Sequence, residues 1–261
     1  MNTLEHIAHT IGLFLFGIYP YIALAVCILG CILRYDREPY TWKAGSSQIM
    51  SKKGTRLANN LFHFGVLGII GGHCVGLLTP HWLYEPFISS AHKQLLAMVA
   101  GGIAGSAVIA GLAMMIRRRF TVARVEKTSS FADKAILILL FTQVSLGLIS
   151  IIVSAGHLDG HTMVKLGEYF QSGVVFNTFA GYEGIRDVNI IYKLHILLGF
   201  TLILLTPFTR LVHAISAPIW YLGRNYQIVR ARTPRRKTVK QALQPLLQKL
   251  PRFGRRKEVQ P

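Results

Sequence analysis

Acidic residues are scarce in this 261-residue sequence, where 11 Asp and Glu stand against 29 Lys and Arg. Charged residues make up only 15% of the chain, whereas a typical soluble domain carries about a quarter. The composition therefore disfavours a soluble globular protein, and its 51% hydrophobic content disfavours a disordered one. Three cysteines are too few for a disulfide framework. The sequence also has no Cys-x-x-Cys-His motif, so no covalently attached c-type haem is expected.

Long runs of apolar residues dominate the sequence. Five of them reach the length of about 20 residues that an α-helix needs to cross a bilayer. They lie at 11–33, 59–78, 95–116, 135–153 and 190–213. The sequence therefore predicts an all-α membrane protein with five transmembrane helices. The third run is rich in Gly, Ala and Ser, which indicates a helix that packs closely against its neighbours.

The basic residues are distributed unevenly among the segments that join these runs. Six lie in 34–58, six in 117–134 and twelve after the last run. The N-terminal arm has none, and the segments 79–94 and 154–189 hold three between them. Because basic loops remain in the cytoplasm, the N-terminus is predicted to be periplasmic and the C-terminus cytoplasmic. The net charge of +18 is thus explained by topology, and no nucleic-acid partner is expected.

Two regions of different composition follow from this pattern. Residues 1–232 are predicted to form one membrane domain, and residues 233–261 a basic cytoplasmic tail. Four leucines in the tail have the spacing of an amphipathic helix, which suits a membrane surface or a partner protein. Pro245 disfavours that helix, and a solvated basic tail is the alternative.

Histidines inside the predicted spans are the strongest functional signal. His63 and His73 lie in the second span, and His195 and His213 lie in the fifth. Ionisable residues at such depth are costly and usually functional. Two helices that offer two imidazoles each match the requirement for bis-histidine ligation of two b-type haems. The alternative is a non-redox transporter or membrane anchor in which these histidines relay protons or bond helices together.

Helix direction predicts which histidines face each other. The second span runs outward and the fifth inward, so His63 pairs with His213 near the cytoplasmic side. His73 pairs with His195 near the periplasmic side. Helix rise separates the first two histidines by about 15 Å and the last two by about 27 Å. Helix tilt or a bend at Pro207 has to absorb this mismatch of about 12 Å.

Other residues near the histidines suit the same interpretation. Glycines in the segment 65–72 would let a flat macrocycle approach the helix backbone, although they also serve ordinary helix packing. Arg210 lies three residues before His213, and its guanidinium is a candidate partner for haem propionates.

Four stretches of the chain carry a resemblance to a known family. They are LRYDREPYTWKAGSSQ at 33–48, NLFHFGVLGIIGGHCVGLLTPHWLYE at 60–85, YKLHILLG at 192–199 and LTPFTRLVHAISAPIWYLGRNYQIVRAR at 205–232. The chain resembles the gamma subunit, the cytochrome b membrane anchor, of respiratory nitrate reductase. This resemblance implies five spans, a periplasmic N-terminus and a place in the cell inner membrane. It also implies a distal haem on His73 and His195 and a proximal haem on His63 and His213.

The resemblance further implies a quinol site beside the distal haem, with Lys93 and Gly72 as site residues. Electrons from the quinol, either menaquinol or ubiquinol, would pass through both haems to an iron–sulfur beta subunit. A molybdenum-containing alpha subunit, at the same cytoplasmic face, would then reduce nitrate. A second enzyme interpretation is the haem b anchor of a related quinone-linked reductase of the heterodisulfide or sulfite type.

Overall fold

The computed structural model describes residues 3–42 and 54–215, which belong to one compact unit, Met1–Ala217. All regular structure within these ranges is helical. Five helices are long and apolar enough to cross a membrane, as the sequence predicts. Their bounds are Thr3–Arg37, Thr55–Leu78, Ser90–Thr121, Phe131–Ala155 and Ile190–Phe208. The predicted tail at 233–261 lies outside the described residues.

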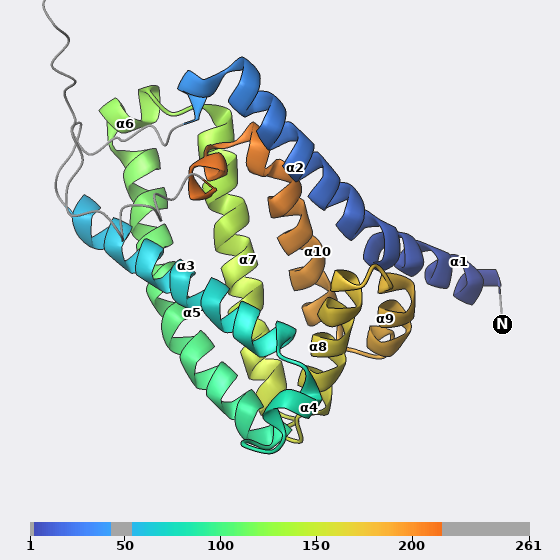
Figure 1. The fold of residues 1–261 in the computed structure, drawn as a ribbon. Helices are drawn as coiled ribbons and strands as arrows, with labels where there is room; N and C mark the ends of the chain where they lie inside the picture. The colour runs from blue at the N-terminus through green and yellow to red at the C-terminus, as the bar shows by residue number, and fades with distance from the viewer. Residues whose placement is uncertain (1–2, 43–53, 216–261) are drawn as a thin grey trace, which may run out of the picture. The chain divides into compact units, whose positions relative to one another are not determined.

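The first span is one continuous rod (Figure 1) made of α1 (Thr3–Gly12), a π-helical turn η1 (Leu13–Ile18) and α2 (Tyr19–Arg37). The π turn has a cause in the sequence, because Pro20 has no N–H to donate to the Phe16 carbonyl four residues earlier. That carbonyl accepts instead from the Tyr169 hydroxyl, at 2.8 Å. The neighbouring Gly17 carbonyl accepts from the Thr178 hydroxyl at 2.6 Å. The irregular turn thereby becomes an attachment point for the loop region 154–189.

That loop region contains two helices, α8 (His161–Val174) and α9 (Thr178–Ile185). Their side chains form the larger core cluster with the first and fifth spans, and Tyr169 is only 1% exposed there. Burial raises the pKa of the Tyr169 hydroxyl, which stays protonated and donates to the first span. The region therefore packs as part of the fold and not as a loose surface loop.

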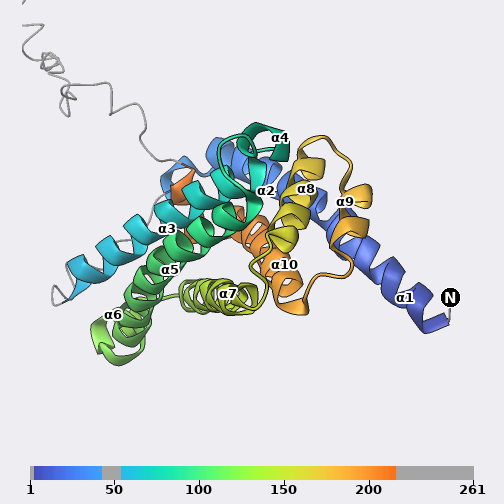
Figure 2. The same ribbon diagram turned by 90° about the horizontal axis from the view of Figure 1, so that it is seen from below.

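The second and third spans, α3 (Thr55–Leu78) and α5 (Ser90–Thr121), lie side by side in both views (Figures 1 and 2). Small residues set their spacing. A Cβ added at Gly111 would lie 2.8 Å from the Ala58 carbonyl oxygen, and one at Gly65 would lie 2.6 Å from Val108. The prediction of close packing by the third span is therefore confirmed. Short helices α4 (His81–Tyr84) and α6 (Ala123–Lys127) flank α5 at its two ends.

The fourth span, α7 (Phe131–Ala155), packs against α5 on one side and α10 (Ile190–Leu205) on the other. The fifth span differs from its predicted range of 190–213. After α10 the chain forms a 3₁₀ turn, η3 (Thr206–Phe208), becomes extended at Thr209 (φ −122°, ψ −179°), and forms a second 3₁₀ segment, η4 (Arg210–Ala214). Figure 1 shows this segment turning aside from the axis of α10. Pro207 explains the break, because its ring cannot continue an α-helix.

Candidate functional site

The structure brings the four intramembrane histidines together as two facing pairs. His63 and His73 lie ten residues apart on α3, His195 lies on α10, and His213 lies on η4. The ring centroids of His63 and His213 are 6.4 Å apart, and those of His73 and His195 are 6.1 Å apart. These are the two pairs expected from helix direction.

Each imidazole is oriented by a hydrogen bond at Nδ1. His63 Nδ1 lies 2.8 Å from the Asn59 carbonyl oxygen, and His73 Nδ1 lies 2.8 Å from that of Ile69. Both acceptors are four residues earlier on α3, so each ring lies along its own helix. A carbonyl can only accept, so Nδ1 carries the proton and Nε2 carries the lone pair that binds a metal.

His195 is oriented by the neighbouring helix α7. Its Nδ1 lies 3.0 Å from the Gln143 carbonyl oxygen, and the Gln143 side-chain amide donates to the His195 carbonyl at 3.0 Å. A Cβ added at Gly147, one turn further along α7, would lie 3.0 Å from His195 Cε1. The imidazole thus rests closely on the α7 backbone, and a side chain at residue 147 would push the ring away by a few tenths of an ångström.

His213 is oriented within its own short helix, because its Nδ1 bonds to the Arg210 carbonyl oxygen. In all four rings the geometry therefore favours the same tautomer. This common tautomer is the one required of a metal ligand that binds through Nε2.

The space beside α3 is open next to His73. A Cβ added at Gly71 or Gly72 would meet nothing within 4 Å, and the His73 residue itself is exposed. The open space at Gly72, the residue next to His73, leaves room there for a large planar group.

The spacing of each pair can be compared with that of two imidazoles that bind one metal from opposite sides. A metal–imidazole bond of about 2 Å, with the ring centre roughly 1.1 Å behind the nitrogen, places two such ring centres about 6.2 Å apart. Both pairs are within 0.2 Å of this value. Among the described residues no group of three or more His, Cys, Asp or Glu side chains could hold a bare metal ion. Two protein ligands per metal fit a haem, because the macrocycle supplies the other four.

Lys93, near the start of α5, lies beside the end of α3. Its Nζ donates to the Thr79 carbonyl oxygen at 3.4 Å and sits 3.6 Å from the centre of the Tyr84 ring. Thr79 follows His73 by six residues, about 9 Å of helix rise. Gln171 of α8 donates to the same carbonyl at 3.4 Å. Lys93 is therefore held by an aromatic face and a carbonyl at the end of the helix that carries His73.

Arg210 contacts a carboxylate at the opposite end of the bundle. Its Nε lies 3.6 Å from one oxygen of Asp133, and Arg119 lies 3.4 Å from the other oxygen. Two guanidiniums thus share one carboxylate near His213. The cluster is cationic overall, which suits the propionate role predicted for Arg210.

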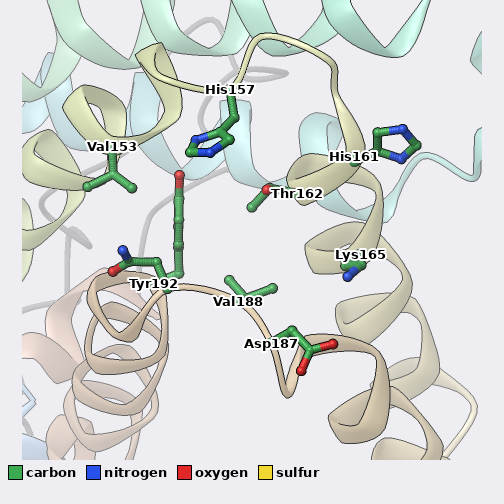
Figure 3. A pocket seen from close by; sticks show the side chains of 9 residues that line it. Val153, His157, His161, Thr162, Lys165, Asp187, Val188 and Tyr192 are labelled. Atoms are coloured by element: carbon green, nitrogen blue, oxygen red, sulfur yellow. The ribbon is translucent and has the colours of Figure 1, made fainter.

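A separate cavity of about 280 Å³ lies between the end of α7, α8 and the start of α10. Figure 3 shows the Tyr192 hydroxyl directed toward His157 in this cavity, with Lys165 and Asp187 near its other side. The same hydroxyl lies 2.6 Å from the Ser154 hydroxyl oxygen. The cavity contains none of the site residues predicted from the sequence.

Five apolar spans with two facing histidine pairs, ten residues apart along one of the helices, fit a helical membrane protein of the b-type cytochrome class. Residues 12–232 match the family model described as nitrate reductase gamma subunit. The chain is 49% identical to respiratory nitrate reductase 1 gamma chain of Escherichia coli (strain K12) over 222 residues, which are 85% of this chain and 98% of the relative. It is 35% identical over 223 residues to nitrate reductase gamma chain of Bacillus subtilis (strain 168), covering 85% of this chain and 99% of the relative.

The chain therefore belongs to the nitrate reductase gamma subunit family, whose members are membrane-anchor cytochrome b subunits. It is a multi-pass membrane subunit of an oxidoreductase complex that contains other subunits. Of the interpretations left open by the sequence, this result favours nitrate reductase over the related quinone-linked reductases and over a non-redox anchor.

Sequence reasoning missed the residues that orient the predicted ligands. Gln143 and Gly147 of α7 lie against His195, and Arg34 of α2 bonds to the segment that leads to His213. Gln143 did offer a signal, since an amide in an otherwise apolar span needs a hydrogen-bonding partner. Gly147 and Arg34 offered no such signal. A glycine in a span is typical of ordinary helix packing, and an arginine at the end of a span is typical of a cytoplasmic loop.

Proposed function

We propose that this chain is the di-haem, quinol-oxidising subunit of a respiratory nitrate reductase. His63 and His213 would hold a proximal haem b, and His73 and His195 a distal haem b. When bound, the two haems would supply one-electron carriers between the quinol and an iron–sulfur subunit. The observation that carries this proposal is the placement of the four histidines as two facing imidazole pairs, with ring centroids 6.4 and 6.1 Å apart.

The protein residues around the ligands have two tasks in this proposal. The backbone carbonyls of Asn59, Ile69, Gln143 and Arg210 fix each imidazole in the ligating tautomer and increase its basicity. The open space at Gly72 would leave room for the quinol beside the distal haem.

Lys93 would bind the quinol. Its ammonium can donate a hydrogen bond to a quinol oxygen and stabilise the negative charge that develops there as the proton leaves. The Tyr84 ring and the Thr79 carbonyl hold this ammonium in place. Each quinol would release two electrons and two protons, and the protons would leave at the end of the bundle predicted to be periplasmic.

The nitrate chemistry would belong to partner subunits. The chain has only three cysteines, two of them on the first span, so it offers no set of four thiolates for an iron–sulfur cluster. We place an iron–sulfur beta subunit and a molybdenum-containing alpha subunit at the cytoplasmic face, beside the proximal pair. Oxidising quinol at one face and delivering electrons to the other would separate charge across the membrane.

Stopped-flow reduction with a menaquinol analogue tests the quinol assignment. The wild-type complex should show rapid reduction of haem b. Lys93→Ala should keep both haems and lose most of that reduction, because the variant removes a donor without touching an iron ligand. Nitrate-dependent reoxidation of haems that an artificial donor has reduced should persist in the variant. Near-normal quinol rates in Lys93→Ala would contradict its role.

A further inference from the structure

Arg34, in the last turn of α2, donates hydrogen bonds to two different parts of the chain. One terminal nitrogen donates to the Pro207 carbonyl at 2.7 Å and to the Thr209 carbonyl at 3.0 Å. The other donates to the Thr41 carbonyl at 2.8 Å, and Nε donates to the Thr41 hydroxyl at 3.1 Å. A single guanidinium therefore connects the end of the first span to the break in the fifth.

The Pro207 carbonyl at this break needs a donor from outside its own segment. In a continuous helix the Pro207 carbonyl would accept from the Leu211 N–H four residues later, but that N–H donates to the Thr209 hydroxyl at 3.3 Å. The extended conformation of Thr209 interrupts that ladder. Because backbone carbonyls in a low-dielectric environment are costly to leave unpaired, the guanidinium stabilises the broken conformation over a continuous helix.

Gly30 makes room for the same contact. It lies one turn before Arg34 on the same face of α2. A Cβ added there would lie 2.8 Å from both Cβ and Cγ of Pro207, so α2 can approach the proline ring only because residue 30 has no side chain. Gly30 and Arg34 together form a clasp on the segment 207–209.

We infer that this clasp positions the proximal haem ligand, an assignment that rests on the proposed function of His213. An unbroken helix would carry His213 about 27 Å along the axis from His195, whereas their partners on α3 are separated by only about 15 Å. The break moves His213 off that axis, and its ring lies 6.4 Å from that of His63. Arg34 contacts neither imidazole; it acts through the backbone that leads to one of them.

The test is a redox titration of the haem b spectra in the complete nitrate reductase complex. Arg34→Gln should lose the proximal haem signal or shift its midpoint potential, while the distal signal stays at the wild-type value. Arg34→Lys should show the same selectivity, because one ammonium cannot reproduce the planar fork that serves carbonyls of two segments. Gly30→Ala should act in the same direction by pushing Pro207 away. Arg37→Gln is the matched control, since Arg37 is exposed in the same helix turn, and it should keep both signals.

Wild-type spectra and potentials for both haems in Arg34→Gln would overturn the inference. If Arg34→Gln loses both haems together, the two milder variants Arg34→Lys and Gly30→Ala test the inference instead. A selective proximal change in either supports the clasp, and equal changes in both haems, or none, overturn it. The haem content of the wild-type chain tests the proposed function separately, because the clasp is judged only from the difference between variant and wild type.

Discussion

Gly147→Ala offers a quantitative test of how α7 orients the distal pair. The new Cβ would lie 3.0 Å from Cε1 of His195, whereas carbon atoms at contact prefer about 3.5 to 4.0 Å. The imidazole would therefore have to move by about 0.5 Å. Such a movement away from α7 stretches the 3.0 Å contact between His195 Nδ1 and the Gln143 carbonyl to about 3.5 Å, where a hydrogen bond is largely lost.

Loss of this bond should weaken the distal ligand. Removing the hydrogen-bond partner of a metal-bound histidine typically lowers metal affinity by about 10- to 100-fold, or about 1.4 to 2.7 kcal/mol. We expect a loss at the lower end of this range for Gly147→Ala, because the ring can adjust in part. The distal midpoint potential should also rise, since a less basic imidazole stabilises ferric iron less well. The proximal haem should not change.

The assay is haem quantification with a redox titration of the purified complex. Gly156→Ala is the matched control, because its new Cβ would lie 3.5 Å from the Val153 carbonyl oxygen, an ordinary contact, at the end of the same helix. Distal haem content and potential equal to wild type in Gly147→Ala would refute the reasoning. Equal losses of both haems would also refute it, because they would indicate general damage to the fold.

The remaining predictions concern the pairing of the ligands. His63→Ala and His213→Ala should each remove the same, proximal haem, as judged from optical and electron paramagnetic resonance spectra. His73→Ala and His195→Ala should each affect the other, distal haem. Loss of one and the same signal in His63→Ala and His195→Ala would contradict the pairing.

The number of spans could be predicted from the sequence because hydropathy is a local property. A run of about 20 apolar residues specifies a membrane helix without knowledge of its neighbours. The pairing of the histidines could also be predicted. The second and fifth spans run in opposite directions, so only one pairing places both members of each pair at a similar depth in the membrane. The structure shows this pairing, whereas the role of the histidines as haem ligands stays a prediction.

Two of the residues that orient the site, Arg34 and Gly147, could not be predicted, because their contacts are made between distant parts of the chain. Hydropathy extends the fifth span to 213, and Pro207 indicates only that a bend is possible there. The size and direction of the bend depend on Arg34, which lies more than 170 residues earlier. In the same way, Gly147 reads as ordinary helix packing until His195 is placed against it.

The central claim is that two facing histidine pairs each hold one haem b. Extraction of the purified complex with acid-acetone, followed by a pyridine haemochrome assay normalised to this chain, tests it most directly. The account predicts two b-type haems for each copy of the chain, because each of the two facing imidazole pairs would hold one haem. One haem per chain, or none, would contradict it.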